Sequence, residues 1–131
     1  MKKKHLLDSF ALLAYLNQEK GYEKVKRLLS SEKSPLLMNE INIGETFYIL
    51  AKRRNLESAE YFLNVILPAL PITYVGNALQ DVIAAARIKA SHPISYADCF
   101  VIATALKEKA AIVTGDPEFR HVEDLVTIEW L

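Results

Sequence analysis

The sequence predicts an α/β fold in which a central parallel sheet lies between two layers of helices. Three observations favour this three-layer α/β/α sandwich. Short apolar segments alternate along the chain with longer stretches of helical periodicity. Only 4 Gly and 5 Pro occur among 131 residues, which favours short connections. No internal repeat and no low-complexity segment interrupts the alternation.

The first half of the chain carries two candidate strands, residues 4–7 and 36–38, and four candidate helices, residues 9–17, 22–29, 40–53 and 56–67. Phe10, Leu13 and Leu16 recur at helical spacing in the first of these helices. Asn39 belongs to the residue types that cap helices, so we expect it to begin the third. Pro68 cannot continue the fourth helix, which we expect to end before it.

The second half carries three candidate strands, residues 72–75, 111–114 and 126–129, and two candidate helices, residues 78–90 and 95–109. The segment 72–75 is rich in β-branched and aromatic residues, which favour strands. Asn77 is expected to cap the helix over residues 78–90. Residues 95–109 are apolar nearly all round, which predicts a buried helix.

Charge and composition restrict the possible classes of protein. Sixteen Lys and Arg residues balance sixteen Asp and Glu residues, which disfavours a protein that coats nucleic acid through bulk positive charge but leaves room for a local basic patch. The chain is 51% hydrophobic and 24% charged, which is typical of a folded domain. We therefore expect one domain over residues 1–131.

Cysteine usage and hydropathy predict a cytoplasmic protein without a membrane partner. Cys99 is the one cysteine, which excludes an intramolecular disulfide and a Cys-rich zinc module. Asp8 interrupts the first apolar segment, so a signal peptide is not expected. No apolar run approaches the roughly 18 residues of a membrane-spanning helix.

Three acidic residues follow candidate strands or begin candidate helices: Asp8, Asp98 and Asp116. Each has an ordinary structural interpretation. Asp8 is a typical N-cap, unless Ser9 takes that role; the pair Ser95 and Asp98 matches a capping box; and Asp116 lies in a turn sequence. In parallel sheets, however, ligands bind outside the carboxyl ends of the strands, so these acids are also candidates for a site.

Glu45 is a fourth candidate, in the middle of the helix over residues 40–53. Its helical neighbours Ile41, Tyr48 and Ile49 are apolar, so Glu45 interrupts an apolar face. A carboxylate there is costly unless a cation or hydrogen-bond donors meet it, or unless it reaches water at the edge of the face. Glu40 lies in the first helical turn, where the helix dipole favours acids, and is expected to be structural.

The four acids together predict a site for a hard divalent cation. Carboxylate ligands without a set of His or Cys suit Mg²⁺ or Mn²⁺ rather than zinc. Clustered carboxylates repel one another unless a divalent ion neutralises them, and bound Mg²⁺ favours phosphate chemistry. Glu118 is expected to be merely an exposed acid in the turn that follows Asp116.

Four sequence blocks carry a family resemblance. Residues 7–14 read LDSFALLA, residues 42–48 NIGETFY, residues 94–105 ISYADCFVIATA and residues 112–119 IVTGDPEF. In this order, and spanning nearly the whole chain, the blocks resemble those of PIN-domain ribonucleases. Within that family they resemble the VapC-type toxins of type II toxin–antitoxin systems.

The resemblance implies a PIN-like fold and a Mg²⁺- or Mn²⁺-dependent endoribonuclease that cleaves RNA with metal-activated water. By position, Asp8 and Asp98 would be the most direct metal ligands. Glu45 and Asp116 would bind the metal through water or orient the attacking water. Thr114 matches a family hydroxyl that helps to hold the site.

Contacts with RNA and with other proteins follow from the same resemblance. Ser9, Arg120 and His121 are candidates for contact with the substrate. The family implies a homodimer and a small VapB-like antitoxin that blocks the acidic site with a basic residue. The helices over residues 22–29 and 56–67 carry enough apolar residues to serve association. The cations at residues 52–54 are expected to pair with a helix C-terminus.

Two other classes of protein are alternatives: a binding module and a different Mg²⁺-dependent phosphoryl enzyme, of which a phosphatase and a receiver domain are examples. A PIN-like domain that binds RNA or a protein without cleavage would have the same fold, although the complete set of four acids disfavours it. A phosphatase of the haloacid-dehalogenase type would need Asp-x-Asp-x-Thr after the first strand, where Ser9 and Phe10 follow Asp8. A receiver domain would need an acidic pair there. The sequence leaves open which RNA is cut and whether the chain is a toxin or a housekeeping nuclease.

Overall fold

The computed structural model describes residues 3–131 and contains one five-stranded sheet, in which all four neighbouring strand pairs are parallel. The strands are β1 (His5–Leu7), β2 (Leu36–Asn39), β3 (Ile72–Val75), β4 (Ala111–Thr114) and β5 (Ile128–Trp130), in the spatial order β3-β2-β1-β4-β5. Leu6 is in register with Leu37 on one side and with Ile112 on the other. The predicted parallel α/β sandwich is therefore confirmed.

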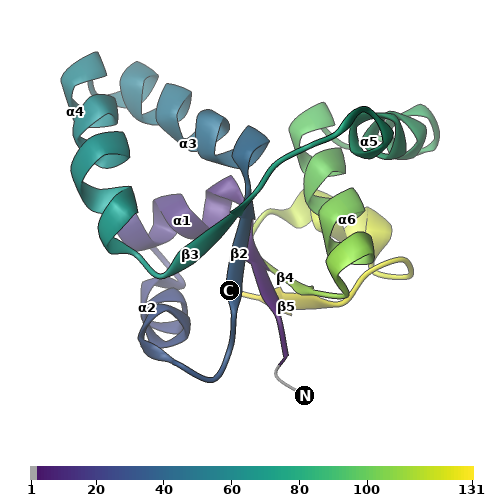
Figure 1. Cartoon of the computed structure of the whole chain (residues 1–131), viewed down its shortest axis with the longest axis horizontal. Helices are drawn as coiled ribbons and strands as arrows, with labels where there is room; N and C mark the ends of the chain where they lie inside the picture. The colour runs from purple at the N-terminus through teal and green to yellow at the C-terminus, as the bar shows by residue number, and fades with distance from the viewer. Residues whose placement is uncertain (1–2) are drawn as a thin grey trace.

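Six α-helices connect the strands: α1 (Ser9–Leu16), α2 (Tyr22–Ser30), α3 (Glu40–Arg53), α4 (Leu56–Tyr61), α5 (Leu79–Ser91) and α6 (Tyr96–Glu108). Helices α1–α4 lie on one side of the sheet, and α5 and α6 lie on the other (Figure 1). A 3₁₀ segment, Pro117–Val122, joins the α5–α6 side. Among the helices of residues 3–131, none combines the length and the apolar character needed to cross a bilayer.

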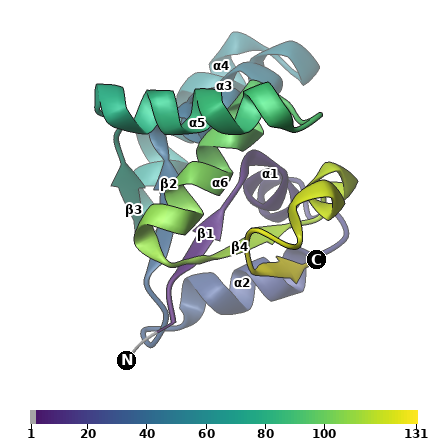
Figure 2. The same cartoon turned by 90° about the vertical axis from the view of Figure 1, so that its right-hand side faces the viewer.

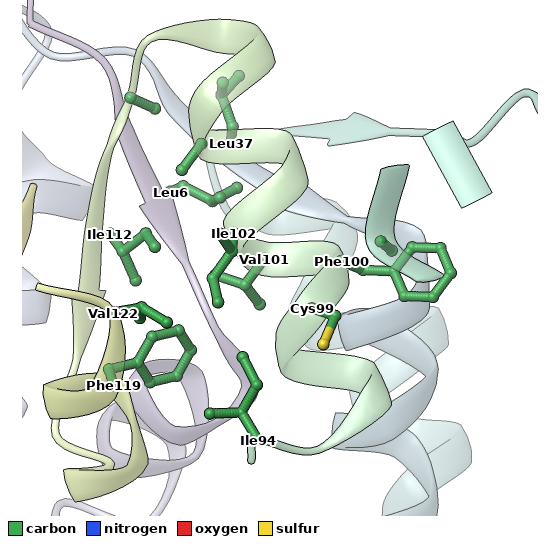
Figure 3. Packing of buried hydrophobic residues seen from close by; sticks show 13 residues of the cluster. Leu6, Leu37, Ile94, Cys99, Phe100, Val101, Ile102, Ile112, Phe119 and Val122 are labelled. Carbon is green, nitrogen blue, oxygen red and sulfur yellow. The ribbon is translucent and has the colours of Figure 1, made fainter. Parts of the chain in front are cut away.

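The core divides into two clusters because successive strand residues point to opposite faces of the sheet. Leu6, Leu37 and Ile112 pack against α6, including Val101 and Ile102, and Figure 3 shows these side chains gathered between the helix and the strands. Leu7, Leu36, Met38 and Val113 pack on the other face against α1–α4. The helix over residues 95–109 was expected to be buried, and seven of the residues in α6 are.

Three predicted boundaries were wrong. The helix expected over residues 56–67 is α-helical only to Tyr61; it continues as a π-helical turn, Phe62–Ile66, and then as a 3₁₀ turn, Leu67–Ala69, which includes Pro68. Asn77 does not cap α5; its amide pairs with Asn39, at 2.8 and 3.0 Å, and Ala78 is the N-cap. The last strand covers Ile128–Trp130 rather than residues 126–129.

Candidate metal and nuclease site

The strand order reverses between β1 and β4, and sheets of this kind bind ligands at the carboxyl ends of the two strands, a place that we call the crevice. From β1 the chain proceeds outward to β2 and β3, whereas β4 lies on the opposite side of β1. At such a reversal the loops after the two strands diverge, and ligands bind outside the carboxyl ends of the strands. Figure 2 shows β1 and β4 side by side. Asp8 directly follows β1, and Asp116 lies two residues beyond β4. Two of the predicted site residues thus lie at the reversal.

Asp8 caps a helix and also belongs to the candidate site. Its Oδ1 accepts a hydrogen bond from the backbone N–H of Ala11 at 2.8 Å, which begins α1. Its Oδ2 accepts a hydrogen bond from the hydroxyl of Thr114. Burial raises the pKa of Asp8 to about 7, against the opposing effect of these two hydrogen bonds; the charges of Asp116 and Glu45 raise it further. Asp8, rather than Ser9, is therefore the cap.

Thr114 connects the ends of β1 and β4. Besides donating to Asp8, its Oγ1 accepts a hydrogen bond from the backbone N–H of Asp116 at 3.0 Å. Asp116 in turn accepts a hydrogen bond from the backbone N–H of Glu118 at 3.0 Å and caps the segment Pro117–Val122. A chain of hydrogen bonds therefore fixes the position of both carboxylates.

Asp98 lies in the first turn of α6, which places it at the same crevice. Ser95 is the N-cap, and its Oγ accepts a hydrogen bond from the backbone N–H of Asp98 at 3.2 Å. Asp98 is only 5% exposed, so its carboxyl is buried. Burial, the charge of Asp8 and the neighbouring Glu118 carboxyl raise the pKa of Asp98 to about 8. A carboxyl in this state binds a proton unless a cation replaces it.

Three carboxylates form what we call the acidic triad, Asp98, Asp116 and Glu118. One oxygen from each lies within 4.8 Å of the other two. The expectation for Glu118 was wrong: it is partly buried in this triad, because the turn that Asp116 caps folds it back. The sequence signal that points to Glu118 is its place directly after the pair Asp116-Pro117, but only the fold brings Asp98 close.

Glu45 joins the crevice from the side of α3. It is partly buried, and its Oε1 accepts a hydrogen bond from the Ser9 hydroxyl at 2.6 Å. Its charge acts on Asp8, but Glu45 is not within the 4.8 Å triad. Glu40, the competing acid, is exposed and lies beside Gly76, after β3. Of these two acids, Glu45 is thus the one near the crevice.

Asn42 is a further residue of the crevice that the sequence analysis did not single out. It is fully buried on α3, and its Nδ2 donates to the backbone carbonyl of Ala97 at 3.2 Å. Since Ala97 precedes Asp98, this contact sets α6 against the helix that carries Glu45. Its Oδ1 has no hydrogen-bond partner within residues 3–131. The sequence signal for Asn42 is its place one helical turn before Glu45.

No basic side chain within residues 3–131 forms an ion pair with Asp8, Glu45 or the acidic triad; the ion pairs of this part of the chain lie elsewhere. Several carboxylates at close range repel one another, and burial increases the repulsion. An all-oxygen donor set with this charge fits Mg²⁺ or Mn²⁺, and it does not fit zinc. The residues present therefore suit a hard divalent cation.

Arg120 and His121, the candidates for contact with the substrate, are exposed on the segment Pro117–Val122 that follows Asp116. The Arg120 guanidinium lies over the Trp130 ring, 5.0 Å from its centroid. Ser9 is buried and donates to Glu45. Arg120 and His121 are thus accessible on the segment after Asp116, whereas the Ser9 hydroxyl is hydrogen-bonded to Glu45.

The model of the PIN domain family matches residues 5–125 of the chain. The chain belongs to the PIN domain family. This PIN domain shares its fold with solved structures of toxin–antitoxin proteins, although no curated protein sequence matches it.

Three of these structures illustrate the similarity. VapBC2 from Rickettsia felis, bound to a DNA fragment from its promoter, has a TM-score of 0.76 at 15% identity, with 98% of each chain covered. VapC20 of Mycobacterium tuberculosis, a toxin that cleaves the sarcin–ricin loop, has a TM-score of 0.75 at 18% identity, with 88% of this chain and 92% of that chain covered. FitAcB from Neisseria gonorrhoeae has a TM-score of 0.66 at 23% identity, with 95% of each chain covered.

Proposed function

We propose that this PIN domain is a Mg²⁺- or Mn²⁺-dependent endoribonuclease that hydrolyses RNA phosphodiester bonds. The observation that carries the proposal is the acidic triad, whose oxygens lie within 4.8 Å of one another without a basic partner in the described chain. Membership of the PIN family supports nuclease chemistry. The fold shared with VapC20, which cleaves an RNA loop, supports RNA as the substrate.

The carboxylates divide into two groups by their burial. Asp8 and Asp98 are buried and are proposed as direct ligands, and Asp116 and Glu45 as ligands through water. Glu118 joins this proposal because it completes the triad. When bound, Mg²⁺ would supply Lewis-acid polarisation of the phosphodiester and a more acidic water.

The remaining groups position these carboxylates. Thr114 is a positioning residue that orients Asp8 and Asp116 through hydrogen bonds. The Ser9 hydroxyl does the same for Glu45. Because the pKa of Asp98 is raised to about 8, binding of a cation near neutral pH displaces a proton, so affinity for Mg²⁺ is expected to rise with pH.

The same proposal makes the chain a VapC-type toxin with a VapB-like antitoxin, acting as a homodimer. Carboxylates without basic partners offer a charge that is complementary to a basic residue from such an antitoxin. Four large apolar side chains on α4 and the turn after it are at least 39% exposed and offer area for association: Leu56, Tyr61, Leu63 and Val65. Growth arrest on expression that a co-expressed neighbouring gene relieves would separate a toxin from a housekeeping nuclease.

The test is cleavage of a structured RNA by the wild type and by Asp98→Asn, with Mg²⁺ and with EDTA. We expect wild-type cleavage that requires Mg²⁺ and that Asp98→Asn abolishes. Asp81→Asn is the matched control, because Asp81 occupies the first turn of α5, where it pairs with Lys107 and not with the acidic triad. EDTA-resistant cleavage by Asp98→Asn would refute the mechanism. RNA binding without cleavage by the wild type would instead favour a non-catalytic binding module.

A further inference from the structure

Phe10 is an exposed aromatic residue in a segment that is otherwise buried. It is 41% exposed, whereas Asp8, Ser9 and Ala11 are buried. The helical spacing of Phe10 and Leu13 predicts that both lie on the apolar face of α1, but only Leu13 is buried. Phe10 therefore belongs to the surface near the buried Asp8 and not to the core.

The ring of Phe10 lies against Gly115. A Cβ atom at Gly115 would lie 2.3 Å from Cε1 and 2.9 Å from Cζ of Phe10, so the edge of the ring occupies the space of a side chain. The φ angle of Gly115 is not positive, so the ring, and not the backbone, demands glycine here. The ring is therefore held against the residue that precedes Asp116.

A pocket of about 280 Å³ opens beside the ring, lined by Phe10, Leu13, Glu19, Lys20 and Arg53. Two of these residues are apolar and two are cationic. Among residues 3–131, no ion pair includes the acidic or either of the basic side chains of the lining. The lining therefore has a net positive charge close to a site with a strongly negative charge.

We infer that this pocket, which we call the Phe10 pocket, is a subsite for a nucleobase of the RNA strand next to the cleaved linkage. The inference rests on the proposed nuclease function. Exposed aromatic rings bind single-stranded nucleic acid by stacking on bases, and nearby cations track its phosphates. Phe10 supplies the ring, and Lys20 and Arg53 supply the cations.

Continuity with the acidic site favours RNA over another occupant. Phe10 is two residues from Asp8, and its ring touches the residue before Asp116. A strand whose phosphate lies at the acidic site would therefore place a neighbouring base at the ring. The positive charge of the pocket lies where a flanking phosphate needs it, since the acidic site itself repels phosphate in the absence of a cation.

The experiment uses a series of RNA oligonucleotides that carry the fluorescent base 2-aminopurine at successive positions, including both sides of any linkage that the wild type cleaves. Stacking on Phe10 should quench the fluorescence at one of these positions. Phe10→Ala should abolish the quenching and raise KM roughly 5- to 150-fold. Phe10→Tyr should restore both, because it retains the ring. Tyr74→Ala is the matched control: Tyr74 is 45% exposed on β3 and should be dispensable.

Phe10→Leu separates stacking from packing, since leucine keeps an apolar contact with Gly115 but loses the aromatic face. Thermal unfolding of each variant shows whether the fold is retained. We expect Phe10→Leu to fold normally and to lose the quenching. Wild-type KM and wild-type quenching in Phe10→Leu would show that the ring only packs, which would overturn the inference.

The outcomes distinguish this inference from the proposed function. If the wild type cleaves with Mg²⁺ while Phe10→Ala retains KM and quenching, the subsite is wrong and the nuclease stands. If the wild type does not cleave but binds the oligonucleotide with quenching that depends on Phe10, the nuclease is wrong and the subsite stands. Lys20→Gln and Arg53→Gln should each reduce the salt dependence of binding by about one counterion, and an unchanged slope would overturn the cationic part.

Discussion

Asp8 is buried at the end of β1, where ionisation of its carboxyl destabilises the folded protein. Its pKa is raised from 3.8 to about 7, chiefly by burial. At 1.36 kcal/mol per pKa unit, the ionised folded state is less stable by up to about 4 kcal/mol than it would be with an unperturbed carboxyl. Replacing Asp8 by Asn should recover most of this free energy.

The sign of the effect follows from proton linkage. The unfolded carboxyl loses its proton near pH 4, and the folded one near pH 7. Between these values Asp8 binds more protons in the folded state than in the unfolded state, so the contribution of Asp8 to stability falls as pH rises from about 4 to 7 and is then constant. In EDTA, the free energy of unfolding of Asp8→Asn relative to that of the wild type should rise by up to about 4 kcal/mol between pH 4 and pH 8.

The substitution is well suited to the test because Asn caps helices as well as Asp does. Its Oδ1 keeps the acceptor for the backbone N–H of Ala11, which the Asp8 side chain now provides at 2.8 Å. The assay is urea unfolding followed by circular dichroism in EDTA at constant ionic strength, at several pH values between 4 and 8.

Asp81→Asn is the control of opposite sign. A hydrogen bond from the backbone of Ala78, followed by Lys107, lowers the pKa of Asp81, so its ionised form stabilises the fold. Neutralising Asp81 should therefore lower the free energy of unfolding at pH 8. The reasoning is refuted if Asp8→Asn differs from the wild type by the same amount at pH 4 and pH 8, or if it is less stable at pH 8.

Three further substitutions probe the crevice. Thr114→Val removes the hydroxyl that donates to Asp8; it should lower the free energy of unfolding by about 1–3 kcal/mol and raise the pKa of Asp8 further, as measured by urea unfolding and carboxyl NMR titration. Gly115→Ala places a Cβ 2.3 Å from the Phe10 ring, so thermal unfolding should show a loss of roughly 1–3 kcal/mol. Glu118→Gln should weaken Mg²⁺ uptake in calorimetry by roughly 10-fold.

Each of these predictions has a contradicting outcome. An Asp8 pKa that stays constant in Thr114→Val would show that the hydroxyl does not stabilise the ionised carboxyl. Unchanged stability of Gly115→Ala would show that the Phe10 ring is free to move. Full Mg²⁺ affinity in Glu118→Gln would exclude the third carboxylate of the triad from the metal site.

Much of the fold was predictable because its signals are local. The strand over residues 72–75 coincides with β3, and residues 111–114 coincide with β4. Asn39 caps α3 as its residue type predicts. The wrong expectation for Asn77 has a tertiary cause. Its side chain pairs with Asn39 at the end of β2, which is more than thirty residues away in sequence.

The sequence by itself determined that apolar segments of two periodicities alternate and that acidic residues follow the strands, because both are properties of neighbours along the chain. The tertiary structure decided which acids meet. Glu118 joins Asp98 only because the strand order brings the turn after β4 against the first turn of α6. The burial that raises the pKa of Asp98 depends on the elements packed around it, so it cannot be inferred from the spacing of residues in the sequence.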